Sequence, residues 1–173
     1  KDGFKNYIKF KYLIGNDTTL SITKSVGFGM FEFGKIFKDI KPDLLVVLGD
    51  RYELISACYA ATLSKIPICH FHGGEQTQGI IDDVTRNCIT KLSHIHFAAT
   101  KKYKKRIIQM GENPKNVFNI GGLGAENIKK DKTVSKKLLE KKYNIKISNS
   151  FCLVTFHPET LSHVKIELQM KPL

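Results

Sequence analysis

The chain has 173 residues, 42% of them hydrophobic and 25% charged, which is typical of a globular protein with a sizeable core. No apolar run approaches the roughly 20 residues that a membrane-spanning helix needs, so we expect no membrane partner. The net charge of +12 raises the question of nucleic-acid binding.

Half of the basic side chains are concentrated in one stretch. Residues 101–148 hold 14 of the 28 Lys and Arg residues but four of the 16 Asp and Glu residues. This stretch is rich in lysine rather than arginine, and no aromatic residues alternate along it as platforms for base stacking. We interpret it as a solvated surface that is compatible with weak attraction of an anionic substrate, and we expect no nucleic-acid partner.

The four cysteines are widely spaced and include no CxxC pair. Free thiols inside apolar segments are common in reduced cytosolic proteins, so we expect a cytoplasmic protein with no zinc site. Because the chain begins with Lys1 inside a polar passage and ends soon after an apolar segment, we expect it to be a piece of a longer protein.

The first third of the chain predicts a strand, a helix and a second strand. Apolar residues alternate within residues 1–14, which favours a strand. Residues 16–19 supply turn and N-cap chemistry for a helix over about 20–39. That helix contains Gly27, Gly29 and Gly34, which favours close packing against the sheet or against a second copy. The five apolar residues at 44–48 predict a strand covered on both faces, as in a parallel sheet.

The rest of the chain alternates helices and strands with short connections. The pattern predicts helices at about 51–64, 81–92 and 101–110, and strands at 66–72, 95–98 and 117–120. This rhythm is typical of a doubly wound, Rossmann-like parallel α/β sheet with right-handed crossovers. A lysine-rich helix over 129–146 and an apolar strand over 151–156 follow. We therefore place an incomplete Rossmann-like domain at 1–125, a connecting segment at 126–150, and the opening of a truncated second domain at 151–173.

Three predicted strand ends each carry an ionisable side chain. Asp50 follows the 44–48 strand through Gly49, His70 and His72 lie at the end of the next strand, and His157 follows the strand at 151–156. The carboxyl edge of a parallel sheet is where α/β proteins bind ligands, so we expect a site there. An N-cap role for Asp50 at the helix starting near Arg51 is the structural alternative.

The loop after the second of these strands is rich in acids and bases. His70 and His72 share a strand face and are candidates for acid/base chemistry or for donation to a pyrophosphate, but each could equally be structural. A metal site would need a third ligand, and we predict none. The remaining candidates are Glu75 after two glycines, Asp82 and Asp83 at a helix start, and Arg86 one turn further. Helix capping accounts for one aspartate better than for two, and Arg86 is placed to pair with either of them.

Four stretches together resemble the UDP-N-acetylglucosamine 2-epimerases, most closely the hydrolysing type, over nearly the whole chain. They are LLVVLGDRYE (44–53), IPICHFHGGEQTQGIIDDVTR (66–86), ITKLSHIHFAAT (89–100) and LVTFHPET (153–160). Asn87, where that family usually has a histidine, and the glutamines Gln76 and Gln78 are departures from its pattern.

The resemblance implies the first domain of a GT-B-like two-domain architecture whose second domain is truncated. It further implies elimination of UDP from UDP-N-acetylglucosamine to a glycal and addition of water, releasing N-acetylmannosamine for sialic-acid-type biosynthesis without any cofactor. By resemblance, catalytic roles fall to the acids and the histidine Asp50, Glu75, Asp82, Asp83 and His157, and substrate-binding roles to Arg51, His70, His72 and Arg86.

The resemblance also implies a UDP-sugar partner and a homo-oligomer at full length, whereas the piece alone is expected to be inactive. Two alternatives remain open at this point. One is a GT-B glycosyltransferase that transfers the sugar to an acceptor, and the other is a non-catalytic nucleotide-sugar-binding fragment.

Overall fold

The computed structural model describes residues 3, 6–15, 18–77, 80–130, 133–148, 150–157 and 164–170. The chain divides into two compact units, Lys1–Gly121 and Gly122–Leu173. None of the helices in the described ranges combines the length and the apolar character required to cross a lipid bilayer.

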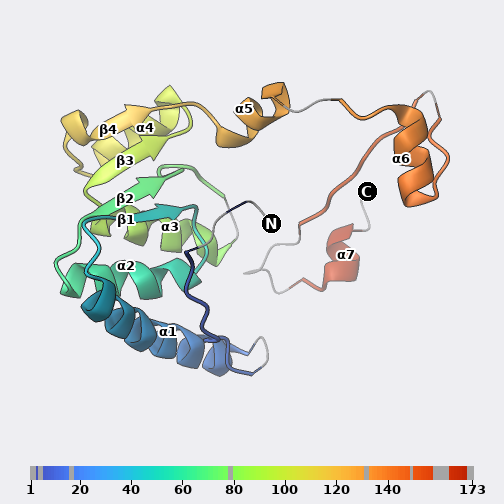
Figure 1. Ribbon diagram of the computed structural model, residues 1–173. Coiled ribbons are helices and arrows are strands. Elements are labelled where there is room, and N and C mark those ends of the chain that lie inside the picture. The colour runs from blue at the N-terminus through green and yellow to red at the C-terminus, as the bar shows by residue number, and fades with distance from the viewer. Residues whose placement is uncertain are drawn as a thin grey trace. The chain divides into compact units, whose positions relative to one another are not determined.

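The first unit is built on a four-stranded parallel sheet with the strand order β1-β2-β3-β4 (Figure 1). The strands are β1 (Leu45–Leu48), β2 (Ile68–Phe71), β3 (Ile95–Ala98) and β4 (Val117–Asn119). The register aligns Val47 with His70, and His70 with His96. The predicted α/β class with a parallel sheet is confirmed.

The helices of this unit lie on one face of the sheet. They are α1 (Thr19–Ile40), α2 (Glu53–Leu63), α3 (Ile81–Leu92) and α4 (Lys101–Gln109), and a 3₁₀ turn, η1 (Pro114–Asn116), precedes β4. Because the strands follow one another in order, right-handed crossovers carry α2, α3 and α4 to the same side. The core beneath them is apolar and includes Phe37, Val47, Ala61, Ile68, Ile89 and Ile107.

The opposite face of the sheet is apolar and partly open. Val46 and Leu48 on β1 are each 57% exposed. The rings of Phe71, Phe97 and Phe118 on the next three strands stack beside each other at centroid distances of 4.6 and 5.5 Å. The prediction that β1 is covered on both faces is wrong for the described residues, because all four helices lie on the other face.

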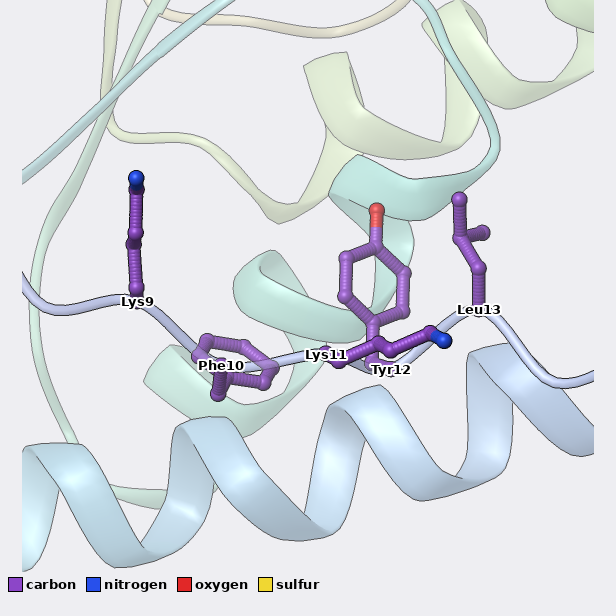
Figure 2. Close-up of a pocket in the computed structure, with 5 residues that line it drawn as sticks. All are labelled: Lys9, Phe10, Lys11, Tyr12 and Leu13. Atoms are coloured by element: carbon purple, nitrogen blue, oxygen red, sulfur yellow. The ribbon is translucent and has the colours of Figure 1, made fainter.

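Residues 6–15 do not form the predicted strand. They run along α1 instead: the Phe10 ring packs edge-on against Phe33 at 5.1 Å, and the Ile14 N–H donates to Ser25 Oγ at 2.8 Å. Figure 2 shows this stretch beside α1 and the pocket of about 460 Å³ that it lines with Lys9, Phe10, Lys11, Tyr12 and Leu13. Its apolar residues pack against a helix rather than a sheet, so alternation was a misleading sign here.

The predicted first helix is confirmed as α1, which Thr18 caps by accepting from the Ser21 N–H at 3.3 Å. One of its three glycines packs closely, since a Cβ on Gly29 would lie 3.1 Å from Ser56 Oγ. A Cβ on Gly27 or Gly34 would meet no neighbouring atom within 4 Å. Close packing therefore explains Gly29 alone.

The described residues of the second unit include the short helices α5 (Leu123–Lys130), α6 (Lys136–Tyr143) and α7 (Ile166–Met170). The predicted continuous helix over 129–146 is wrong, because Ser135 caps α6 and Asn144 ends it in the left-handed conformation at φ 52°. Residues 151–157 form no strand, and none of the described residues pairs with them as a strand needs. The assignment of 126–150 as a connection and of 151–173 as the opening of a second domain stays a prediction.

Candidate active site

The predicted site residues of the first unit gather at the carboxyl edge of the sheet. Because the strands are parallel, the segments that leave β1 and β2 emerge at the same edge. The segment after β1 carries Asp50 and Arg51, and the segment after β2 carries His72 and Glu75. Helix α3 follows the second segment (Figure 1).

Arg86 joins three of these segments. Its side chain is 3% exposed, and its Nη1 donates to Asp83 Oδ1 at 3.0 Å. Its Nη2 donates to Asp50 Oδ2 and, at 3.1 Å, to Thr77 Oγ1. The Thr77 N–H also donates to Asp83 Oδ1, at 2.9 Å. The planar fork of a guanidinium suits such bridging, and it brings two of the predicted catalytic carboxylates together.

Neither Asp50 nor the aspartate pair acts as a side-chain cap. The N-cap of α2 is Tyr52 and that of α3 is Ile80, and neither makes a side-chain capping bond. Asp82 and Asp83 do lie in the first turn of α3, where the helix dipole favours a carboxylate. The Asp50 carboxylate is committed to Arg86 instead.

Asp82 lies beside this network in a different electrostatic environment. Burial raises its pKa from the ordinary 3.8, and the negative charge of Asp50 raises it further, with a smaller contribution from Glu53. Arg51 and Arg86 act in the opposite direction without reversing the shift. The surroundings therefore raise the proton affinity of the Asp82 carboxyl group above that of an ordinary aspartate.

His72 and Glu75 form a second group at this edge. The His72 Nδ1 lies 3.0 Å from Glu75 Oε1, and its Nε2 is shielded from solvent with no hydrogen-bond partner among the described residues. His72 has a φ of 64°, which costs a non-glycine residue about 1–2 kcal/mol. Its N–H is held by the Phe97 carbonyl at 2.8 Å. Because β2 ends at Phe71, His72 does not continue the strand alternation from which the prediction began.

His70 faces the interior beneath the helices and is fully buried. Its Nε2 lies 2.8 Å from the Gly49 carbonyl oxygen, and its Nδ1 lies 3.3 Å from Thr90 Oγ1. Burial lowers its pKa to about 4. The other predicted binding residue, Arg51, is largely exposed and pairs with Glu53 at 2.5 Å.

The loop that carries Glu75 is fixed against α4. Gly74 has a φ of +76°, and a Cβ there would lie 2.5 Å from the Tyr103 carbonyl oxygen, so only glycine fits this close approach. Arg106 donates to the Gly74 carbonyl and, at 2.7 Å, to Gln76 Oε1. Gln78 and Gly79 lie outside the described residues.

Three further histidines belong to other parts of the described chain. His157 belongs to the second unit and is exposed there, so its convergence with the other residues stays a prediction. The Ile68 N–H donates to His94 Nδ1 at 3.3 Å, and His96 is buried with its Nε2 3.3 Å from Glu112. The described residues contain no cluster of three or more His, Cys, Asp or Glu side chains that could hold a metal ion.

Three polar residues that support the site were not singled out from the sequence. Thr77 bridges Arg86 and Asp83, Thr90 lies against His70, and Arg106 holds the loop. Arg106 was hidden in a run of lysines. Thr77 and Thr90 carry no charge and stand in no recognisable spacing, so only the folded contacts distinguish them.

Comparison with known proteins identifies the family of the chain. The family model described as UDP-N-acetylglucosamine 2-epimerase matches residues 2–170. The GDP/UDP-N,N'-diacetylbacillosamine 2-epimerase (hydrolyzing) of Campylobacter jejuni subsp. jejuni serotype O:2 is 42% identical over 170 residues, which are 98% of this chain and 44% of that relative. The polysialic acid biosynthesis protein P7 of Escherichia coli is 42% identical over an alignment of 174 residues, which covers 100% of this chain and 44% of that relative. The chain thus spans less than half the length of these relatives.

Solved structures show the same fold. The UDP-GlcNAc 2-epimerase from Neisseria meningitidis, solved bound to UDP-GlcNAc, superposes with a TM-score of 0.63 at 22% identity. The match covers 76% of this chain and 38% of that one. This similarity supports the predicted Rossmann-like, GT-B-type fold class.

Proposed function

The chain belongs to the UDP-N-acetylglucosamine 2-epimerase family, and we propose that the protein of which it forms part converts UDP-N-acetylglucosamine to N-acetylmannosamine and UDP. The observation that carries the proposal is the pairing of Asp50 and Asp83 through the buried Arg86, with Asp82 beside them. It places carboxyl groups with different surroundings at one sheet edge, as acid and base chemistry requires.

The proposed reaction has two stages. In the first, the C2–H and C1–O bonds of the sugar break, the C2–H electron pair forms a C1=C2 bond, and UDP leaves with the C1–O pair. In the second, a proton adds to C2 from the opposite face, and the oxygen of water adds to C1 while that water loses one proton to the solvent. Both stages pass through positive charge at C1, which nearby carboxylates stabilise.

The surroundings of the carboxyl groups support distinct roles for them. Asp50 and Asp83, held by Arg86, would face the developing positive charge at C1. Asp82, whose pKa is raised by burial and by the charge of Asp50, would give the proton to C2 in the second stage. Glu75, held by His72, would take the C2 proton in the first.

The remaining predicted roles belong to the same proposal. His157 would stabilise the departing diphosphate. Arg51, whose side chain is largely exposed after β1, would contact the substrate. His72 has an unpartnered Nε2 within the described residues and is suited to a substrate hydroxyl. We treat His70 separately, because its burial and its two partners favour another role.

The experiment that tests the function is a reaction of the full-length protein with UDP-N-acetylglucosamine in D₂O and no acceptor. The proposal predicts free UDP and N-acetylmannosamine that carries one deuterium at C2, because the C2 proton exchanges with solvent between the two stages. A glycosyltransferase would instead need an acceptor, and a binding fragment would leave the nucleotide sugar intact. Either result would contradict the proposal.

A second substrate has direct support from a relative's name. The Campylobacter jejuni relative is named for GDP/UDP-N,N'-diacetylbacillosamine, a sugar with a second acetamido group. Measuring kcat/KM for both UDP-sugars under the same conditions would decide between them. A ratio above about 10², which corresponds to roughly 2.7 kcal/mol of differential transition-state binding, would identify the natural substrate.

Location and assembly are part of the proposal as well. All four cysteines are free, which is typical of a reducing compartment and supports the cytoplasm. A homo-oligomer is supported by exposed apolar side chains on the first unit, including Phe31 on α1 at 64% and Leu63 on α2 at 67%. Light scattering on the full-length protein would give the oligomeric state.

A further inference from the structure

His70 lies between the two elements that carry Asp50 and Arg86. It is the third residue of β2, fully buried, and both of its ring nitrogens have partners. On one side is the Gly49 carbonyl, immediately before Asp50 in the chain. On the other is Thr90, one turn after Arg86 on α3, whose hydroxyl also lies 2.9 Å from the Arg86 carbonyl oxygen.

The contacts fix the tautomer of the ring. A carbonyl oxygen only accepts hydrogen bonds, so the Nε2 that lies 2.8 Å from Gly49 O carries a proton. The groups that act on the ring charge are Arg86 and His96, which oppose protonation, and Asp50 and the Gly49 carbonyl, which favour it. Burial is the largest influence and keeps the ring neutral, with a pKa of about 4. The bare Nδ1 is then an acceptor that lies 3.3 Å from the Thr90 hydroxyl, whose single hydrogen is shared with the nearer Arg86 carbonyl oxygen at 2.9 Å.

Local geometry makes these contacts matter for the site. Gly49 turns the chain at a φ of +90° directly after β1, and the bond from His70 sets where that turn lies. The absence of a side chain at Gly73 leaves room for the His70 ring, because a Cβ there would lie 3.1 Å from both His70 Nδ1 and Thr90 Oγ1. A shift of the Gly49 turn would move Asp50 relative to Arg86.

We propose that His70 is a positioning residue that fixes the Asp50 turn against α3 as a neutral, Nε2-protonated imidazole, and that it neither touches the substrate nor exchanges a proton during the reaction. The inference rests on the proposed function only in that Asp50 is taken as a catalytic carboxylate. It changes the role expected from the sequence, where His70 was a candidate for substrate binding.

The first test is a ¹⁵N NMR titration of the full-length protein with labelled histidine. The proposal predicts one imidazole that keeps the neutral Nε2–H signature across about pH 5–8, the range in which an ordinary histidine titrates. The Thr90→Val variant, which removes the hydroxyl beside Nδ1, should shift that same signal and so assign it to His70. Titration of this ring near pH 6.5, or an Nδ1–H signature, would overturn the proposal. A protein with the predicted signature that releases no N-acetylmannosamine would contradict the proposed function and leave the inference on His70 standing.

The second test separates positioning from proton transfer with two variants. His70→Gln keeps a donor near the Nε2 position and should lower kcat less than about 10-fold, whereas His70→Leu lacks the donor and should lower it about 10²-fold, as a misplaced catalytic group does. The pH profile of kcat/KM should keep its shape in both variants. If His70→Gln loses as much turnover as His70→Leu and also loses one limb of the profile, His70 transfers a proton and the proposal is wrong. Should His70→Leu fail to fold, the glutamine variant and the titration still decide between the two roles.

Discussion

Asp50 and Arg86 stand 36 positions apart in the sequence and form an ion pair at the carboxyl edge of the sheet. The same guanidinium binds Asp83 and Thr77, so one buried cation organises the turn after β1, the loop after β2 and the first turn of α3. A single side chain therefore links most of the candidate site to the fold, and its replacement should affect both activity and stability.

Replacing Arg86 should destabilise the protein strongly. Arg86→Met would leave two carboxylates without their buried partner, for which we expect a loss of about 3–5 kcal/mol in the free energy of unfolding. The stability of Arg86→Lys should lie between those of the parent protein and Arg86→Met, because an ammonium group keeps the charge but cannot bridge two carboxylates as a guanidinium does. Urea denaturation measures the change. The matched control is Arg51→Met, whose ion pair with Glu53 is exposed and should be worth at most about 1 kcal/mol; equal losses in the two methionine variants would refute the central place of Arg86.

Asp82 should give the activity a pH dependence of defined sign. As a proton donor it is active when protonated, so kcat/KM should fall as the pH rises through its raised pKa. Asp82→Asn has no proton to give and should lower kcat by about 10²–10⁴-fold while removing that limb of the profile. An asparagine variant that keeps the limb would show that another group is responsible.

The same carboxyl group should make the stability depend on pH with the same sign as the activity. Its pKa is raised in the folded protein, so its stabilising contribution is present below the ordinary value of 3.8 and is lost as the pH rises through the raised pKa. Asn at this position stays neutral at every pH. We therefore expect Asp82→Asn to have a higher Tm than the parent protein at pH 7 and an equal Tm below pH 3.8. A lower Tm at pH 7 would contradict the electrostatic description of this residue.

His72 allows backbone strain to be separated from function. His72→Gly relieves the left-handed φ of 64° but removes the contact with Glu75, so its Tm should stay close to that of the parent protein. Its kcat should fall at least about 10-fold if the histidine holds Glu75 for proton transfer. Full activity in a stable glycine variant would mean that the His72–Glu75 contact has no part in the reaction.

Gly74 should tolerate no side chain, in contrast to Gly27. A Cβ on Gly74 would lie 2.5 Å from a backbone oxygen of α4 at a φ of +76°, so we expect Gly74→Ala to cost about 1–3 kcal/mol. Gly27→Ala is the matched control, because a Cβ there meets nothing and alanine stabilises a helix interior by about 1 kcal/mol relative to glycine. Thermal denaturation of both variants tests the pair, and the account is wrong if the two shifts have the same sign.

The sequence predicted those site residues that lie directly after the ends of strands. Asp50 was recognisable because it follows a buried strand through a glycine, and the bounds of α3 were predicted correctly as Ile81–Leu92. Parallel strands place their carboxyl ends together, so the meeting of Asp50 with the start of α3 needed no knowledge of side-chain contacts.

The parts that were missed depend on tertiary contacts. Alternation places His70 on one strand face but does not tell whether helices or solvent lie over that face. The strand ends at Phe71, one residue earlier than the pattern suggests, because His72 adopts a left-handed φ of 64°. Residues 6–15 alternate like a strand, yet they pack along α1, because Phe10 finds its apolar partner in Phe33.

The most direct test of the account is the turnover of Asp50→Asn in the full-length protein, measured with UDP-N-acetylglucosamine in D₂O. Asparagine preserves the size of the side chain and an oxygen that can accept from Arg86, so folding should change little. The account predicts that the release of N-acetylmannosamine deuterated at C2 falls by about 10²–10³-fold, as when one preorganised charge-stabilising group is removed. Near-normal turnover in this variant would remove Asp50 from the mechanism and contradict the central claim.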